Sequence, residues 1–145
     1  MAGRPWLTFG GTTDPPALRR EVRARPQELA PLRGALRDWL LTAGVGEDDV
    51  VALQIAAGEA VANAVEHAYE GIEPGPVWLA ATLEPPQVVR VEIGDCGRWR
   101  PQHDPNNERG RGLLLMRECV DEVTLARSPA GTTVVLRLGL SGKRD

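Results

Sequence analysis

The sequence lacks several features that would place it in a specialised class. It has no apolar run near the roughly 20 residues that a membrane-spanning helix needs. Its N-terminus lacks the charged-then-apolar pattern of a signal peptide. The formal net charge is −3, so no overall basic field favours nucleic acid as a partner. We therefore expect a cytoplasmic protein that binds neither a membrane nor, directly, a nucleic acid.

Cysteine and lysine are also scarce. Cys96 and Cys119 are the two cysteines, and they fit no metal-ligand spacing, so we expect reduced thiols rather than a disulfide. Lys143 is the only lysine, and this arginine bias suggests a GC-rich genome. Two nucleotide-binding motifs are missing as well. There is no G-x-x-x-x-G-K-[ST] phosphate loop, and a G-x-G-x-x-G fingerprint fails because Leu115 occupies its third glycine position.

The sequence contains the ingredients of one globular domain. It has 145 residues, of which 42% are hydrophobic and 26% charged, enough for one core and too few for two comfortable ones. Residues 1–17 show no periodicity and are interpreted as a flexible arm. We expect the domain to cover 18–140 and a short tail to cover 141–145.

The expected elements segregate along the chain rather than alternate strictly. This arrangement favours an α+β class, a two-layer sandwich of a mixed, mostly antiparallel sheet with helices on one face. Hydrophobic spacing and turn residues predict strands over 18–25, 76–83, 88–95, 121–128 and 131–140, and helices over 26–42, 47–68 and 112–120.

A polar stripe runs along the helix expected over 47–68. At 100° per residue, Glu59, Asn63, Glu66 and His67 share one arc beside an alanine-rich face that we expect to be buried. In the simplest interpretation these polar side chains face solvent, and Glu66 fits this interpretation well. Glu59 and Asn63 together suggest more. An amide oxygen suits Mg²⁺, and a carboxylate one turn away would orient or deprotonate an attacking hydroxyl. His67 would either brace this carboxylate or pack at the helix end.

A second candidate site follows the strand expected over 88–95. Asp95 and Gly97 are common turn residues in this position. Alternatively, a buried carboxylate at Asp95 would accept a hydrogen bond from the exocyclic amine of adenine and would discriminate against guanine. Gly97 would then let the backbone approach the flat base.

Glycines and arginines precede the last predicted helix. Arg100, Arg109 and Arg111 accompany Gly110 and Gly112, and a glycine-rich helix start with arginine is typical of phosphate binding, although G-x-G alone is a weak signal.

The last predicted strand begins with Gly131, Thr132 and Thr133. Threonine is common in strands, and one of these hydroxyls would alternatively join a water network around a base.

The four motifs occur in one order: E-x-x-x-N on a helix, D-x-G after a strand, G-x-G before a helix and G-T at a strand start. This order and spacing resemble the Bergerat-fold (GHKL) ATPases, the superfamily of gyrase and the sensor histidine kinases. Within it, EAVANAVEHAY and GRGLLLMRECVDEV resemble the anti-sigma-factor serine kinases. The resemblance covers about residues 18–140.

The resemblance implies a role for each motif. Glu59 would be the catalytic base, Asn63 the Mg²⁺ ligand, and Asp95 the residue that binds the adenine amine with Gly97 beneath the base. The sequence departs from the pattern at Trp99, where many Bergerat ATPases have a third glycine.

The resemblance also implies a lid over the nucleotide, formed by residues 98–111. Gly110 and Gly112 would lie at the phosphates, and Arg109 would contact a phosphate. Thr132 would assist Asp95 through water.

Proteins of this branch bind ATP and Mg²⁺, sequester a sigma factor, often as homodimers, and phosphorylate a serine of a STAS-domain antagonist. The resemblance therefore implies an ATP-dependent serine/threonine-protein kinase that acts as an anti-sigma factor. One alternative is an ATP-sensing module that captures a partner without catalysis. Another is a domain of a larger phosphatase–kinase regulator. A complete histidine sensor kinase is not expected, because the chain has no phospho-acceptor helical hairpin.

Overall fold

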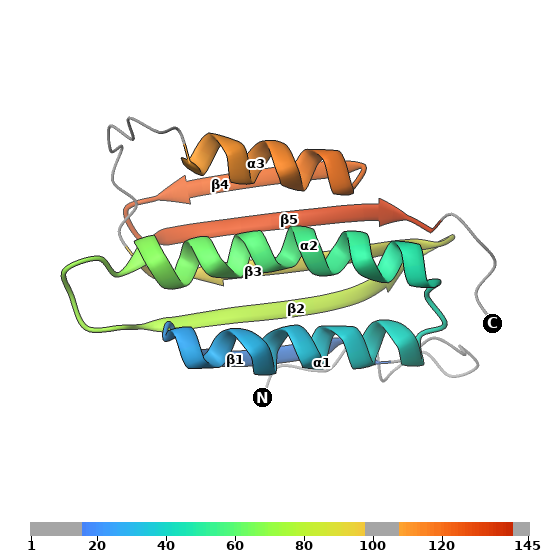
Figure 1. The fold of residues 1–145 in the computed structure, drawn as a ribbon, viewed down its shortest axis with the longest axis horizontal. Helices are drawn as coiled ribbons and strands as arrows, with labels where there is room; N and C mark the ends of the chain where they lie inside the picture. The colour runs from blue at the N-terminus through green and yellow to red at the C-terminus, as the bar shows by residue number, and fades with distance from the viewer. Residues whose placement is uncertain (1–15, 98–107, 141–145) are drawn as a thin grey trace.

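In the part of the chain that the structure describes, three α-helices cover one face of a five-stranded sheet (Figure 1). The computed structural model describes residues 16–97 and 108–140. The arm predicted over 1–17 and the tail predicted over 141–145 therefore lie almost entirely outside the described residues. The strands are β1 (Leu18–Arg23), β2 (Pro76–Glu84), β3 (Val88–Asp95), β4 (Glu122–Ser128) and β5 (Gly131–Gly139). The helices are α1 (Leu29–Thr42), α2 (Glu47–Asn63) and α3 (Glu108–Cys119).

The sheet has the order β1-β2-β3-β5-β4, so β5 lies between the two strands that precede it. The α+β class is confirmed, and so are both predicted hairpins, β2–β3 and β4–β5. We expected a mixed, mostly antiparallel sheet, and the four pairings among the described strands are all antiparallel. The turn between β2 and β3 contains the cis peptide bond between Pro85 and Pro86.

The first two helices form where the sequence predicts them. Pro26 opens a single 3-10 turn that leads into α1, a position where its missing N–H costs little. Acidic residues fill the first turn of α2, where the helix dipole favours negative charge. After α2 a π-helical turn, η3 (Ala64–Ala68), carries the chain to the predicted end of the helix. Gly71, with φ of 76°, then reverses the chain at little steric cost.

The start of α3 is a correction. We expected this helix over 112–120, whereas α3 begins four residues earlier, at Glu108, and contains Gly110 as well as Gly112. A glycine inside a helix costs about 1 kcal/mol, so local propensity predicts a helix boundary at this pair. At Gly112 this cost is accompanied by a close approach of α3 to α2, because a side chain there would crowd Glu59.

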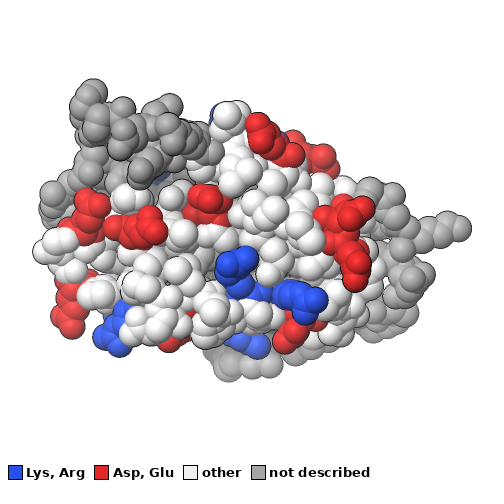
Figure 2. All heavy atoms as spheres, viewed as in Figure 1, with Lys and Arg blue, Asp and Glu red and all other residues white. Residues whose placement is uncertain are grey.

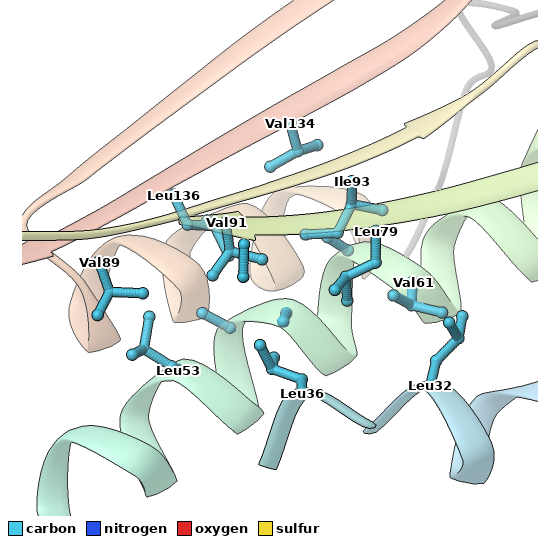
Figure 3. Packing of buried hydrophobic residues seen from close by; sticks show 14 of the residues in the cluster. Leu32, Leu36, Leu53, Val61, Leu79, Val89, Val91, Ile93, Val134 and Leu136 are labelled. Atoms are coloured by element: carbon cyan, nitrogen blue, oxygen red, sulfur yellow. The ribbon is translucent and has the colours of Figure 1, made fainter. Parts of the chain in front are cut away.

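The core lies between the helices and one face of the sheet (Figure 3). Side chains alternate along β2, β3 and β5, so that every second residue is buried beneath the helices. Leu53 of α2 points toward Val89 of β3, and Leu36 of α1 also points toward the strands. Burying one such side chain contributes about 1.5–3 kcal/mol, so this layer holds the helices in a fixed position on the sheet.

The face formed by the helices carries charges of both signs. Its described acidic and basic side chains are interspersed and separated by uncharged surface (Figure 2). Within the described ranges, no helix is long and apolar enough to span a membrane.

Candidate nucleotide-binding site

The predicted site residues meet at one end of the molecule. The C-terminal end of α2, the end of β3 and the starts of α3 and β5 all lie at the left end of Figure 1. The site is therefore built from four elements that are separate in the sequence. The packed core between helices and sheet fixes their relative positions.

Glu59 and Asn63 lie one turn apart on the side of α2 that faces α3. A Cβ added to Gly112 would stand 3.1 Å from Oε2 of Glu59 and 3.5 Å from Nδ2 of Asn63. Both side chains are partly exposed, and Gly112 is buried. The structure thus brings together a carboxylate, an amide and a glycine of the neighbouring helix.

The rest of the polar stripe turns away from this point. Glu66 is exposed, as expected for a solvated residue. Nδ1 of His67 lies 3.1 Å from Oε1 of Glu70, and its Nε2 lies 3.7 Å from Oε2 of Glu66. His67 therefore contacts its neighbours in sequence at the helix end, which fits the packing interpretation rather than the bracing of Glu59.

Asp95 is the carboxylate most enclosed by the protein at this end. It closes β3 with 7% of its surface exposed. The Gly97 amide donates to Oδ1 of Asp95 at 3.0 Å. Burial raises the pKa of Asp95 above its ordinary value of 3.8, while hydrogen bonds from the Gly97 and Thr132 amides act in the opposite direction. A carboxylate can take about four hydrogen bonds, so the Gly97 and Thr132 amides, the two donors among the described residues, leave acceptor capacity on Asp95.

Thr132 reaches Asp95 through its backbone. The two residues are partners in the β3–β5 register, and the Thr132 amide acts on the Asp95 carboxylate. The predicted role of the Thr132 hydroxyl in a water network remains a prediction. The neighbouring Gly131 has φ of 147°, and a Cβ there would stand 2.0 Å from the carbonyl oxygen of Asp95. A glycine is needed at this position for both reasons.

The packing of the turn after β3 requires a glycine at position 97. A Cβ added there would stand 2.1 Å from the carbonyl oxygen of Ala68, at the end of η3. The glycine therefore allows the turn after β3 to pack directly on the end of the helix. Its predicted place beneath a base stays a prediction.

Tyr69, the only tyrosine of the chain, is a residue that the sequence analysis missed. Its side chain is buried at 9% exposure just after η3. The Tyr69 hydroxyl donates to the carbonyl oxygen of Pro76 at 2.6 Å and accepts from the Cys96 amide at 2.9 Å. The signal available in the sequence was the position of this tyrosine at the end of the motif-bearing helix, directly before Glu70 and Gly71.

Part of the predicted lid lies outside the described residues. This holds for 98–107, which include Trp99 and Arg100. The backbones of Arg109 and Gly110 belong to the first turn of α3. The predicted phosphate contacts of Arg109, Gly110 and Gly112 remain predictions.

Comparison with known proteins places these features in a family. Residues 22–138 match the histidine kinase-like ATPase domain. The serine-protein kinase RsbW of Bacillus velezensis is 30% identical over 141 residues, which cover 88% of each chain. The anti-sigma F factor of Bacillus licheniformis is 32% identical over 106 residues, which cover 65% of this chain and 72% of that protein.

Among solved structures, the RsbU and RsbW domains of Rv1364c from Mycobacterium tuberculosis are similar with a TM-score of 0.74 and 29% identity. The similarity covers 90% of this chain and 34% of that chain, so this chain spans about a third of that longer protein.

Proposed function

Because this chain belongs to the family of histidine kinase-like ATPase domains, in the branch of the RsbW serine-protein kinases and anti-sigma F factors, we propose that it is an ATP- and Mg²⁺-dependent serine/threonine-protein kinase that acts as an anti-sigma factor. One observation carries the proposal. Glu59 and Asn63 face Gly112 of α3 at the same end of the molecule as the buried carboxylate of Asp95.

The residues at this end suit ATP by their chemistry. The buried carboxylate of Asp95 would accept a hydrogen bond from the exocyclic amine of adenine. Guanine presents a carbonyl oxygen there, and two facing acceptors in a buried site are costly, so ATP should be preferred to GTP. Because Gly112 has no side chain, the backbone of α3 comes close to Glu59 and Asn63, the two residues that would act on the phosphates and the metal ion.

Asn63 suits Mg²⁺ for a separate reason. An amide oxygen is a hard ligand, and one protein ligand together with phosphate oxygens and waters makes an ordinary Mg²⁺ shell. When bound, the ion would supply charge neutralisation to the phosphates. Asn63 would hold it one helical turn from Glu59.

Glu59 would act as the general base in the transfer. Its carboxylate would take the proton from a serine hydroxyl of the partner protein as the serine oxygen forms a bond to the γ-phosphorus. The bond between that phosphorus and the bridging oxygen breaks, and ADP leaves with the bonding electrons. A positioned base of this kind contributes about 10²- to 10⁴-fold to the rate.

The partners follow from the family and not from a contact in the structure. We propose that the protein sequesters a sigma factor and phosphorylates a STAS-domain antagonist, acting as a homodimer in the cytoplasm. The name of the anti-sigma F factor supports the sequestration of a sigma factor, and the name of the serine-protein kinase RsbW supports the phosphorylation of a serine.

A second candidate is an ATP-sensing module that captures its partner without phosphorylating it. The partly exposed Glu59 and the buried Asp95 would serve nucleotide binding equally well in such a module. The RsbU and RsbW domains of one mycobacterial chain also illustrate that a domain of this kind can belong to a larger regulator.

The decisive test is phosphate transfer to a STAS-domain protein, followed by its intact mass, with Glu59→Gln and the matched control Glu66→Gln. Both changes remove one glutamate charge from the same helical stretch, but only Glu59 faces Gly112. We expect Glu59→Gln to bind ATP and to lose at least a hundredfold in transfer rate, since it removes the base. Glu66→Gln should transfer at the wild-type rate.

Unchanged transfer in Glu59→Gln would refute the role of the base. ATP binding without any phosphorylated partner in the wild type would favour the sensing module instead.

A further inference from the structure

Tyr69 occupies the point where the β2–β3 ladder ends. Val77 and Asp95 form the last pair at this end of the register, so Pro76 and Cys96 stand where the next pair would form. The Cys96 amide and the Pro76 carbonyl are the groups that a further rung would join. Instead of meeting each other, both bond to the Tyr69 hydroxyl, at 2.9 Å and 2.6 Å.

We propose that Tyr69 is a positioning residue for base recognition, whose hydroxyl replaces the last rung of the ladder and so sets the direction of the turn from Asp95 to Gly97. The inference rests on the proposed nucleotide site and deepens it. Tyr69 does not need to touch the nucleotide, because it acts through the backbone that carries Asp95.

A hydroxyl is suited to this place because it both donates and accepts. Pro76 has no N–H, so a direct rung here would have a single hydrogen bond, from Cys96 to Pro76. That bond would hold the two backbones about 2.9 Å apart, atom to atom. With an oxygen inserted between them, the strands separate after Asp95 and Cys96 can leave the sheet.

The ring of Tyr69 is fixed from a second side. A Cβ added to Gly75 would stand 2.5 Å from Cε1 and 2.9 Å from the hydroxyl oxygen of Tyr69, so the ring packs on a backbone that has no side chain. The preceding Ala68 in turn contacts Gly97. The segment Ala68–Tyr69 therefore supports both sides of the turn that presents Asp95.

Burial also keeps the hydroxyl in the form that the geometry requires. Desolvation raises the pKa of Tyr69 above its ordinary value of 10.0, so the group stays a protonated donor under ordinary assay conditions.

The test is Tyr69→Phe, which keeps the ring and removes the bridging oxygen. We expect the affinity for ATP to fall about tenfold, because the hydrogen bond between Asp95 and adenine is weakened when the turn moves. A tenfold loss corresponds to about one typical hydrogen bond. The preference for ATP over GTP should fall too, because Asp95 is less precisely held. The transfer rate at saturating ATP should stay within about twofold, since Glu59 is untouched. By NMR, the Cys96 amide should exchange its hydrogen faster in the variant.

Trp39→Phe is the matched control. It also removes one side-chain donor to a backbone carbonyl, the 2.8 Å bond from Nε1 of Trp39 to Pro16, but on α1. It should leave ATP affinity and base preference unchanged. Gly75→Ala is a second variant in case Tyr69→Phe does not fold, because it should displace the hydroxyl by crowding the ring.

Wild-type affinity and base preference in Tyr69→Phe, or in Gly75→Ala if only that variant folds, would overturn the inference while leaving the ATP site in place. If the wild type itself binds no ATP, the proposed function fails and this inference fails with it.

Discussion

Asp95 shows how a single residue can serve a site at the expense of the fold. Its carboxylate is almost fully buried, and burial raises its pKa because the charged form loses contact with water. Two backbone amides compensate in part. The proposed adenine amine would add a third donor, so the cost of this buried charge is reduced when the nucleotide is bound.

The raised pKa of Asp95 predicts the direction in which stability changes with pH. The folded protein holds this proton more tightly than the unfolded chain, so ionising Asp95 costs stability. The cost is absent below the ordinary pKa of 3.8 and fully present once the pH exceeds the raised folded value. Replacing Asp95 by Asn removes the titration.

We therefore expect the free energy of unfolding of Asp95→Asn, minus that of the wild type, to be larger at pH 7 than near pH 3.5, so that the variant gains stability relative to the wild type as the pH rises. Chemical denaturation of both proteins across this range measures the difference. A difference that stays constant, or that grows as the pH falls, would show that Asp95 carries no such penalty.

At the scale of elements, the sequence predicts segments better than contacts. The helices and strands followed from apolar spacing, because a helix repeats every 3.6 residues and a strand every two. Apolar spacing did not predict the pairing of Asp95 with Thr132 or the hydrogen bonds of the Tyr69 hydroxyl. The bridge joins Tyr69 to Cys96 across 27 residues, and no local pattern specifies such a partner.

The predicted start of α3 was wrong for a related reason. Local propensity treats Gly110 and Gly112 as breakers, whereas the helix continues through both. What Gly112 provides is close approach to Glu59 and Asn63, which only the packed structure reveals. For the proposed site, the sequence motifs predicted Glu59, Asn63 and Asp95, and the structure added the contacts of Tyr69 and the contact between Gly97 and Ala68.

The approach of α3 to α2 predicts the effect of Gly112→Ala. The new methyl group would stand 3.1 Å from the Glu59 carboxylate, which can shift because it ends a flexible side chain. We expect a folded protein whose transfer rate is about ten- to a hundredfold lower, because a reacting group is displaced by a few tenths of an ångström or more.

Gly34→Ala is the control for this helix substitution. Gly34 lies on α1 with nothing within 4 Å of an added Cβ. It should raise stability by about 0.5–1 kcal/mol, the usual gain when alanine replaces an exposed helical glycine, and should leave transfer unchanged. Wild-type transfer in Gly112→Ala would mean that the α2–α3 contact does not position Glu59.

At the scale of the whole molecule, the core lies between the two layers and the proposed site lies at one end of them. The helices and the sheet bury one continuous core, and the proposed nucleotide site lies where α2, β3, α3 and β5 end or begin together (Figure 1). A ligand that bridges these elements would bind only the folded chain. It would therefore stabilise the protein by about 2.7 kcal/mol at a concentration 100 times its Kd.

Binding of ATP is thus the most direct test of the central claim that this end of the molecule is a nucleotide site. Titration calorimetry would measure ATP affinity with Mg²⁺ and with a chelator, for the wild type and for Asp95→Ala. We predict binding in the wild type that needs Mg²⁺ and is lost in Asp95→Ala. No binding at millimolar ATP, or equal binding by Asp95→Ala, would contradict the account.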